Sequence, residues 1–372
     1  MTGQESRHGL VWARPWMLVA LVATLYLVVV IALHDGDPLA LATLGTRFSE
    51  GDPAGSEGYD GQFAYYIARD PAGARDLVDV PAYRYQRILY PLLARILAFG
   101  QAALIPYTLP LINVIALAAG TWCVEEILHR YRVSRWYAVT FGLYAGQLMS
   151  ARLDLAEPLS YALVVAAILG AEHDRWRWTI VLFALSALAR ETSLLFAGGY
   201  LLFLVVQRDW RRAVALAAGA GVPWIAWQVI LWLWLGRPGF GSGGAGATPW
   251  EIVPFRGLWS VGTVDLRVLA LLALIVLPLA VIPAVLALWA TARDLLAGRW
   301  NPYATMLLAN AAIFLFLPQS SYREPLAMLR LATGLVVATI LYAARKRSRR
   351  ILNYSLLWLA SLVFLLKEGP VP

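Results

Sequence analysis

The chain has 372 residues, of which 60% are hydrophobic and 15% are charged, and its formal net charge is +8. A soluble domain typically carries about 25% charged and ~45–50% apolar residues, so this composition excludes an ordinary soluble protein and requires lipid to cover the apolar surplus. The basic residues form short clusters between apolar runs rather than one continuous face, which also excludes a nucleic-acid-binding protein.

Apolar runs of membrane-spanning length recur along the whole chain. A helix needs about 20 apolar residues to cross the hydrocarbon core, with ~17–25 tolerated. The first run, 15–33, is not followed by a small-residue cleavage site, which predicts a membrane helix rather than a signal peptide. Two shorter runs, 137–150 and 159–171, can span only with neighbouring residues or a tilt. The other runs that qualify are 103–123, 213–235, 268–292, 303–318, 326–343 and 351–366.

Segment 179–206 decides the topology because it holds Arg190 and Glu191 at its middle. It is either one helix or two half-length helices that meet at a polar turn. Lys and Arg accumulate in cytoplasmic loops, and only the hairpin places every basic cluster on one side, together with Arg7 and Arg14. These clusters are Arg130/Arg132/Arg135, Arg175/Arg177, Arg208/Arg211/Arg212, Arg293/Arg299 and Arg345/Lys346/Arg347/Arg349/Arg350.

The hairpin topology predicts an all-α polytopic membrane protein with about eleven transmembrane segments and a cytoplasmic N-terminus. Residues 1–372 then form a single integral membrane domain. Its outer face carries a long first loop, 34–101, with short helices and a Gly-rich loop, 237–266, besides the shorter segments 151–158 and 319–325. Charges at membrane depth are costly and usually functional. We therefore expect the chemistry on this outer face, and the protein in a bacterial plasma membrane.

Residues 59–66 of the first outer loop read YDGQFAYY. The Asp60–Gly61 pair is a turn signal, and one interpretation is a surface turn that leads into a short helix. The alternative is an interfacial site near lipid headgroups, where the Asp60 carboxylate acts as general base on an acceptor hydroxyl. The aromatic character of the segment favours the site.

Segment 84–100 of the same loop has apolar residues at helical spacing from Ile88 onward. This pattern predicts an amphipathic helix in the membrane interface. Arg95 is expected to extend its charged end toward lipid headgroups. Arg87, beside Gln86, can instead bind phosphate oxygens bidentately.

Three further groups of charged residues lie in the outer segments. Asp154 and Glu157 are three residues apart, so they share a face if they are helical. Such a pair either binds a metal, divides acid and base roles, or places acids at a helix N-terminus against the macrodipole. Arg190 and Glu191 are either functional or a structural ion pair, since an unsatisfied pair at this depth would be costly. Arg323 and Glu324, in the last outer loop, are a weaker pair of the same kind, and Arg323 is the candidate of the two.

Several common motifs are absent from the sequence. There is no P-loop glycine pattern, which excludes an ATP-driven pump, and no HExxH or GxSxG motif, which excludes two families of hydrolases. The single cysteine, Cys123, excludes an intrachain disulfide and a thiolate metal site. Nothing in the sequence requires a metal, a nucleotide or another cofactor.

Four segments follow one another in a recognisable order: YDGQFAYYIA at 59–68, LYPLLAR at 89–95, EPL at 157–159 and LSALAR at 185–190. In this order and topology they resemble the GT-C glycosyltransferases. Within these enzymes the chain is most similar to the PIG-V-type mannosyltransferases of GPI-anchor synthesis and their bacterial relatives. The resemblance covers 58–202.

The chain departs from the family pattern at several positions. Tyr59 stands where the family has Trp, and Arg87 and Ile88 stand where two Phe precede the Leu-Tyr-Pro element. Glu191 follows Arg190 where Pro is usual, and Arg323 matches the arginine near the C-terminal span only approximately. These differences bear on the donor and the acceptor more than on the class of reaction.

The resemblance implies a GT-C-like fold and a sugar donor linked through phosphate to a polyprenol, with mannose as a candidate sugar. Asp60 is implied to be the general base of an inverting transfer to a lipid, glycan or protein acceptor, and Arg190 and Arg87 to bind the donor phosphate. The remaining candidates would shape the substrate site; they are Tyr59, Gln62, Tyr65, Tyr66, Asp154, Glu157, Glu191 and Arg323.

Two other classes stay open at this point. A lipid or solute transporter also places charges in a membrane cavity, but it typically has internal repeats and broken helices in matched halves. This sequence has one candidate broken segment, 179–206, and no internal repeat. A non-catalytic subunit of a membrane assembly would keep the fold and lose the catalytic acid, whereas Asp60 is present.

Overall fold

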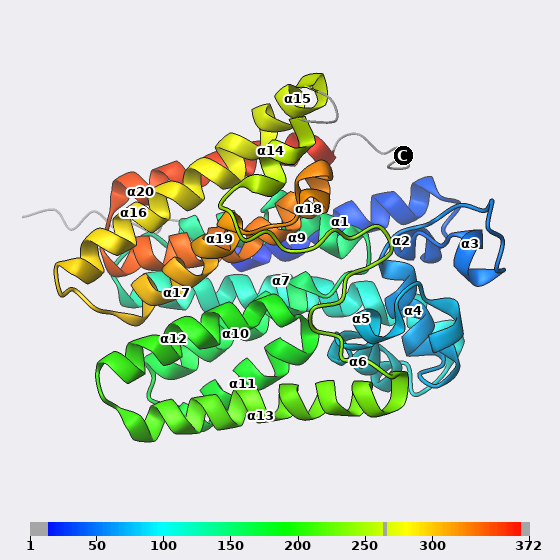
Figure 1. The fold of residues 1–372 in the computed structure, drawn as a ribbon, viewed down its shortest axis with the longest axis horizontal. Helices are drawn as coiled ribbons and strands as arrows, with labels where there is room; N and C mark the ends of the chain where they lie inside the picture. Colours follow the sequence, from blue (N-terminus) through cyan, green and yellow to red (C-terminus); the bar gives the residue numbers. More distant parts are fainter. Residues whose placement is uncertain (1–13, 263–265, 366–372) are drawn as a thin grey trace, which may run out of the picture.

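The computed structural model describes residues 14–262 and 266–365, so Arg7 lies outside the described residues. Within these ranges the regular elements are helices, and no strand occurs (Figure 1). Five helical stretches are long and apolar enough to cross a membrane: Pro15–Leu33, Ala102–Arg130, Trp210–Leu235, Ala273–Leu296 and Pro325–Arg345. The chain is therefore an all-helical membrane protein, as predicted.

The predicted hairpin in 179–206 is confirmed. Helix α11 (Trp176–Ala189) ends before Arg190, whose backbone is extended (φ −159°, ψ 126°). A short 3-10 turn follows, and α12 (Leu194–Val206) then begins. The break releases the Arg190 and Glu191 side chains from an apolar helix surface, where their charges would face lipid.

Other predicted spans are shorter or less regular than their hydropathy indicates. The run 303–318 is helical as α17 (Pro302–Ala312) and 3-10 turn η6 (Ile313–Leu315). The run 137–150 is divided between α8 (Val139–Gly142) and α9 (Ala145–Arg152). The run 351–366 begins in α20 (Arg349–Ser355) and continues as 3-10 helix η7 (Leu356–Leu365).

Prolines explain the irregular course of the run 268–292. Helix α15 (Leu266–Val276) passes through a π-helical turn (Leu277–Val281) into α16 (Ile282–Leu296). Pro278 and Pro283 lie in this transition and cannot donate backbone hydrogen bonds. The helical hydrogen-bond pattern therefore changes there from the α-helical to the π-helical spacing.

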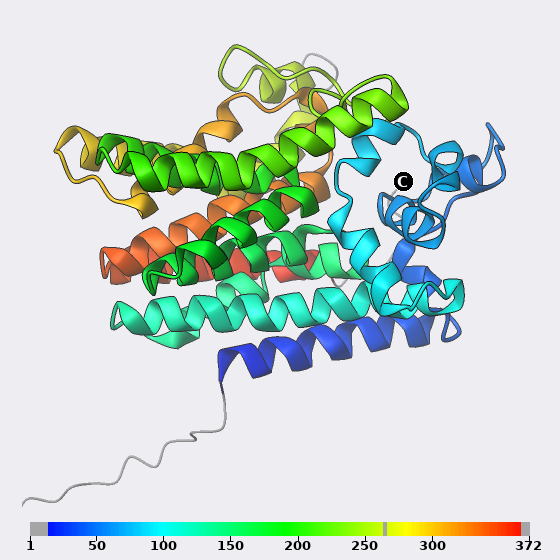
Figure 2. The same cartoon turned by 90° about the horizontal axis from the view of Figure 1, so that it is seen from below.

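The long helices run between two ends of the bundle, as Figures 1 and 2 show, and the charged side chains at these ends differ. At one end, here called the basic end, ion pairs join the five basic clusters and their neighbours: Arg130–Glu172 at 2.8 Å, Arg212–Asp174 at 3.2 Å and Lys346–Asp294 at 2.6 Å. Arg347 also donates to the carbonyl of Tyr131. The clusters therefore lie together, as the hairpin topology predicts. The opposite end, here called the cavity end, carries the short helices of the first loop.

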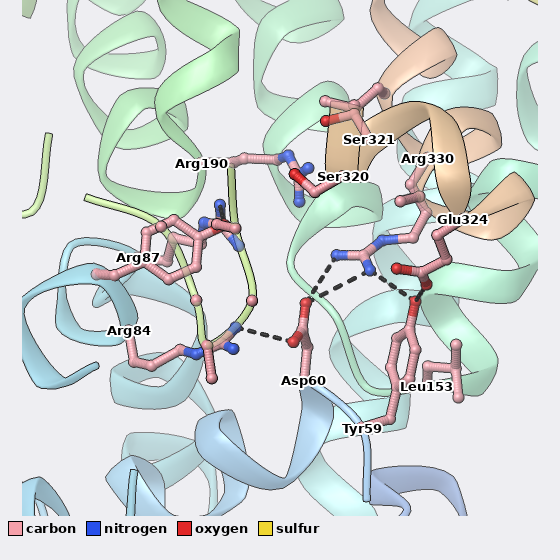
Figure 3. Close-up of a pocket in the computed structure, with 18 of the residues that line it drawn as sticks. Tyr59, Asp60, Arg84, Arg87, Leu153, Arg190, Ser320, Ser321, Glu324 and Arg330 are labelled. Carbon is pink, nitrogen blue, oxygen red and sulfur yellow. Dashed lines mark hydrogen bonds and ion pairs between the residues drawn. The ribbon is translucent and has the colours of Figure 1, made fainter. Parts of the chain in front are cut away.

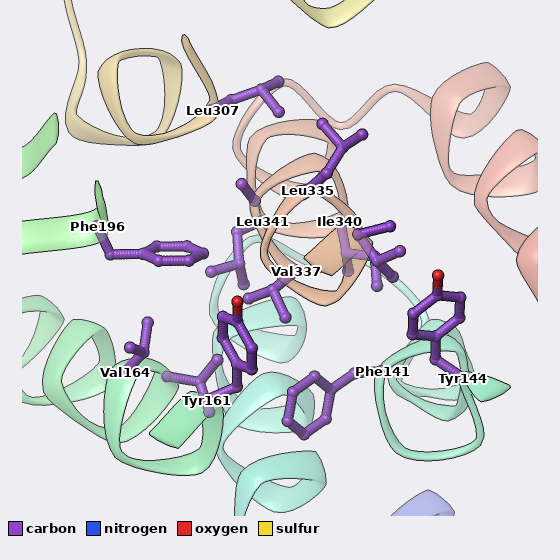
Figure 4. Packing of buried hydrophobic residues seen from close by; sticks show 14 of the residues in the cluster. Phe141, Tyr144, Tyr161, Val164, Phe196, Leu307, Leu335, Val337, Ile340 and Leu341 are labelled. Carbon is purple, nitrogen blue, oxygen red and sulfur yellow. The ribbon is translucent and has the colours of Figure 1, made fainter. Parts of the chain in front are cut away.

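Helix α19 (Pro325–Arg345) forms the centre of the bundle, and 83% of its most apolar window is buried inside the protein. Figure 4 shows its Leu335, Val337, Ile340 and Leu341 packed among side chains of several other helices. A close approach fixes its position: a Cβ on Gly146 of α9 would lie 2.3 Å from the carbonyl oxygen of Leu329. The next residue, Arg330, is thereby directed toward the cavity end.

The first loop, 34–101, folds into α2 (Leu39–Ala42), α3 (Thr46–Ser49), α4 (Gly61–Arg69), η1 (Gly73–Leu77), α5 (Pro81–Tyr85) and α6 (Leu89–Leu97). Helix α6 is amphipathic as predicted, and its exposed face carries Leu92, Ile96 and Leu97. Arg95 does not extend toward headgroups. It donates to the carbonyls of Ala68 and Arg69, because the C-terminus of α4 offers unpaired acceptors beside it.

The remaining long helices complete the bundle. They are α1 (Pro15–Leu33), α7 (Ile105–Arg130), α10 (Glu157–Glu172) and α13 (Trp210–Leu235). A chain segment that follows α13 crosses the cavity end and leads to α14 (Arg256–Gly262), as Figure 1 shows. Helix α18 (Gln319–Arg323) and the residues before α19 close the same end.

Candidate active site

Asp60 lies at the N-terminus of α4, at the centre of the cavity end (Figure 3). A Cβ on Gly61 would lie 2.0 Å from the carbonyl oxygen of Leu153, so glycine lets α4 abut the link between α9 and α10. The Asp60 carboxylate then faces two guanidinium groups. Its Oδ1 is 2.9 Å from Arg84 Nη1, and its Oδ2 is 3.4 Å from Arg330 Nη2.

These cations determine the charge state of Asp60. Burial opposes ionisation of the carboxyl group, but the positive charges of Arg84, Arg330 and Arg87 outweigh burial and hold the pKa of Asp60 below its ordinary value. Asp60 is therefore a carboxylate throughout the neutral pH range.

Arg84 is held in place by a second acid. Its Nε and Nη2 lie 2.7 Å and 2.8 Å from Oδ1 and Oδ2 of Asp79, in a bidentate pair. The guanidinium also lies over the ring of Phe63, with 4.2 Å to the centroid. Only Nη1 of Arg84 is left to reach Asp60, so Asp79 fixes the direction of that contact.

Arg330 connects Asp60 to three other polar groups. Its Nε lies 2.6 Å from Oε1 of Glu157, and its Nη1 donates to the hydroxyl of Tyr59 at 3.0 Å. The Tyr59 hydroxyl in turn donates to Oε1 of Glu324 at 2.6 Å. Burial raises the pKa of Tyr59, so this hydroxyl keeps its proton for the Glu324 carboxylate.

Glu157 is shared between two buried arginines. Its Oε1 lies 2.6 Å from Nη1 of Arg190 as well as 2.6 Å from Nε of Arg330. The Arg190 contact lacks the direction of a hydrogen bond, and Nε of Arg190 donates to Thr192. Arg190 therefore keeps donor capacity for a ligand in the cavity.

Arg87 and Glu191 form the pair on the opposite wall. Arg87 donates from Nε at 3.0 Å and from Nη2 at 2.6 Å to the two carboxylate oxygens, and its Nη2 also contacts Tyr83. The interpretation of Arg190 and Glu191 as partners of each other is wrong. The two side chains leave the turn in different directions, so that Glu191 binds Arg87 and Arg190 binds Glu157.

Asp60 and the four arginines line one cavity with a volume of about 2250 Å³, whereas Asp79 and Glu157 lie behind its wall. Figure 3 shows Arg84, Arg87, Arg190 and Arg330 arranged around the space next to Asp60. Its wall is partly apolar, and the apolar lining includes Leu33, Leu39, Leu44, Leu194, Trp224, Phe240, Leu317 and Leu331. The cavity thus combines an arginine-rich centre with apolar sides.

Three predicted residues of the first loop lie away from this cavity. Gln62 accepts from the backbone N–H of Gly45 and donates to the carbonyl of Glu57, so it holds the preceding turn together. Tyr65 and Tyr66 are buried in a second apolar cluster beneath α4. Because Asp60 is at the N-terminus of α4, these positions point to other faces of the helix than the cavity.

Asp154 and Glu157 do not share a helix face, so that prediction is wrong. Asp154 adopts a left-handed backbone (φ 49°) after the end of α9, whereas Glu157 is the first residue of α10. Asp154 is fully buried with both carboxyl oxygens unpaired in the described part of the chain, and burial raises its pKa. Among the described residues, no group of three His, Cys, Asp or Glu is placed to hold a metal ion.

The sequence reasoning overlooked Arg84, Asp79 and Arg330 as members of the site, and it gave Glu324, which accepts from Tyr59, little weight. Arg330 carried a usable signal, because it is an ionisable residue inside the apolar run 326–343. Arg323 is exposed at the cavity wall, seven residues earlier, and Arg330 is the arginine of this region that reaches Asp60.

The fold and the site define a helical membrane protein with a large cavity in which several arginines surround the carboxylate of Asp60. Comparisons of the chain with protein-family models, with curated proteins and with solved structures find no match. The function is therefore argued from the cavity and from the motifs that lead into it.

Proposed function

We propose that this protein is a membrane glycosyltransferase of the GT-C type. It transfers a sugar, with mannose as a candidate, from a polyprenyl-phosphate donor to an acceptor hydroxyl on a lipid, glycan or protein. The observation that carries the proposal is the Asp60 carboxylate in a large, partly apolar cavity, next to several guanidinium groups that are each held by an acidic side chain.

Arg87 and Arg190 are the groups that bind the donor phosphate. Arg84 and Arg330 direct their donors to Asp79, Asp60 and Glu157. Arg87 uses Nε and Nη2 for its internal contacts, and Arg190 Nη1 makes no directed hydrogen bond. Each of these two guanidinium groups already faces an internal carboxylate, so only part of its positive charge is left to balance a ligand. The site therefore favours a singly charged phosphodiester over a more highly charged diphosphate.

In the proposed reaction the acceptor oxygen attacks the anomeric carbon on the face opposite the phosphate. Asp60 takes the hydroxyl proton, the new carbon–oxygen bond forms, and the bond to the phosphate oxygen breaks with its electron pair on the phosphate. Configuration inverts because attack and departure occur on opposite faces. Negative charge grows on the phosphate in the transition state, so fixed guanidinium groups stabilise that state preferentially.

The apolar part of the cavity suits the polyprenol chain of the donor. Leu194 and Trp224 line the same cavity as Arg190 and Glu191, so a lipid chain against these apolar groups can leave its phosphate beside the arginines. Burial of each additional methylene group of the chain stabilises binding by about 0.8 kcal/mol.

The basic end is proposed to face the cytoplasm, which places the cavity on the non-cytoplasmic side of eleven segments. Single cysteines at Gly243 and Gln319 are then expected to react with a membrane-impermeant maleimide on intact cells, and a cysteine at Ser348 to react only after permeabilisation. Labelling of Gly243 only after permeabilisation would reverse the orientation.

The experiment that tests the function is a transfer assay with purified protein and a panel of radiolabelled polyprenyl-phosphate sugars. Sugar transfer to lipid, glycan or protein acceptors, with inverted configuration, is expected for one donor. Movement of a donor across a vesicle membrane without chemical change would instead identify a transporter. Neither transfer nor movement would favour a subunit that lacks its own activity.

A further inference from the structure

Residues 239–250, with the sequence GFGSGGAGATPW, form an extended segment that we call the strap. Every residue of the strap lines the cavity, and Figure 1 shows it crossing the cavity end between α13 and α14. Glycine-rich chain loses much conformational entropy when it is ordered. Specific contacts must therefore hold the strap in place.

Both ends of the strap are attached to the helical scaffold. Near its start, Oε1 of Gln228 accepts from the N–H groups of Gly239 at 2.8 Å and Phe240 at 3.1 Å. Near its end, Thr248 and Ser320 exchange hydrogen bonds, with Ser320 N–H donating to the Thr248 hydroxyl at 3.0 Å. These contacts are between neutral groups and involve none of the charged residues around Asp60.

The middle of the strap is attached to a charged residue of the site. The N–H of Ala245 donates to Oδ2 of Asp79 at 2.8 Å. The same Asp79 binds Arg84 bidentately, and Arg84 Nη1 reaches Oδ1 of Asp60 at 2.9 Å. A continuous series of hydrogen bonds thus leads from the strap to Asp60.

The packing of Gly244 shows how closely the strap lies on this pair. A Cβ at Gly244 would be 2.8 Å from Nη2 of Arg84 and 3.2 Å from Oδ2 of Asp79. A side chain here would push against the guanidinium that orients Asp60. Glycine at this position therefore permits direct contact between the strap backbone and the Arg84–Asp79 pair.

We propose that Asp79 is a positioning residue that couples the strap to Asp60. The seated strap orients Asp79, Asp79 orients Arg84, and Arg84 orients the carboxylate of Asp60. A substrate that fills the cavity contacts the strap, because the strap forms part of the wall, so substrate contact and the position of the base are linked. The role of Asp60 as base rests on the proposed function, whereas the attachment of the strap by Asp79 does not.

Hydrogen–deuterium exchange tests the attachment without any assay of activity. Asp79→Ala is expected to accelerate exchange in peptides that cover 243–247 at least tenfold, because the Ala245 N–H loses its acceptor. Asp76→Ala is the matched control, since Asp76 is an exposed acid of the same loop that pairs with Arg75. Equal protection of 243–247 in wild type and Asp79→Ala would overturn the proposal.

Gly244→Ala tests the coupling in a variant that keeps every charge. It is expected to lower kcat for sugar transfer about tenfold with an unchanged KM for the donor, because Arg84 shifts while the phosphate arginines stay in place. Gly198→Ala is the control, since a Cβ there meets no atom within 4 Å. Wild-type kcat in both Gly244→Ala and Asp79→Ala would overturn the coupling. Absence of transfer by the wild type would refute the proposed function, and the exchange result would still decide the attachment.

Discussion

The two ends of this protein use the same charged residue types in different ways. At the basic end the side chains of Arg130 and Arg212 are 48% and 45% exposed, and water screens their ion pairs. At the cavity end the side chains of Arg190 and Arg330 are each 6% exposed and share one carboxylate. Exposed pairs contribute little to stability, at most about 1 kcal/mol. Buried guanidinium groups are costly, and their concentration around one aspartate is best explained by a ligand that needs them.

The largest expected difference between the ends concerns Asp60. Asp60→Asn keeps the size of the side chain and cannot accept a proton at neutral pH, so transfer should fall about 10²–10⁴-fold while donor binding persists. Asp174→Asn, at the basic end, should transfer sugar at the wild-type rate. Transfer and binding of a radiolabelled donor by both variants make the comparison, and wild-type transfer by Asp60→Asn would falsify its role as base.

Glu157 should matter more for stability than any exposed acid. Glu157→Gln leaves two buried guanidinium groups without their shared charge, which is expected to cost about 3–5 kcal/mol of unfolding free energy. Asp174→Asn breaks an exposed pair and should cost less than about 1 kcal/mol. Thermal unfolding in detergent measures the loss of stability in both variants. Equal decreases in unfolding temperature for Glu157→Gln and Asp174→Asn would contradict the larger contribution expected of the buried carboxylate.

An Arg-to-Lys substitution at each end of the bundle tests whether the guanidinium group itself, rather than its charge, is needed for sugar transfer. Arg190→Lys keeps the charge and loses the planar fork that binds phosphate oxygens, so transfer should fall roughly 10- to 100-fold. Arg130→Lys at the basic end should have no effect on transfer. Kinetics at equal expression decide this, and equal activity of the two variants would remove Arg190 from the phosphate site.

The smallest expected effect is the response to mild acid. The arginines hold the pKa values of Asp60 and Asp79 below the ordinary value in the folded protein. Their contribution to stability is therefore fully present above about pH 4, the unfolded pKa, and is lost as pH falls through the folded pKa values. The contribution of Asp79 is measured as the difference in unfolding temperature between wild type and Asp79→Asn, which cancels the effect of other titrating groups such as Asp154. This difference should be level between pH 7 and pH 5 and should shrink below about pH 4. A difference that already shrinks near pH 6 would contradict the ionised state of Asp79.

Local patterns in the sequence were sufficient to predict an all-helical membrane protein and the helical hairpin in 179–206. Long apolar runs must be helical in lipid, because no water is available for unpaired backbone groups. The hairpin at Arg190 followed from the one-sided basic clusters, and the Asp60–Gly61 pair marked the start of a helix. Each of these inferences depends on composition or on neighbours in the chain.

The tertiary structure decided which charged residues surround Asp60. Arg330 meets Asp60 across 270 residues, and Glu157 rather than Glu191 meets Arg190. These contacts depend on how α4, α10 and α19 are rotated and how closely they approach, for example where Gly146 packs against the backbone of α19 and Gly61 against Leu153. Hydropathy and charge patterns specify neither rotation nor close approach. The sequence alone therefore determined that Asp60 and a set of arginines lie at the end opposite the basic clusters, and packing determined which of these arginines surround Asp60.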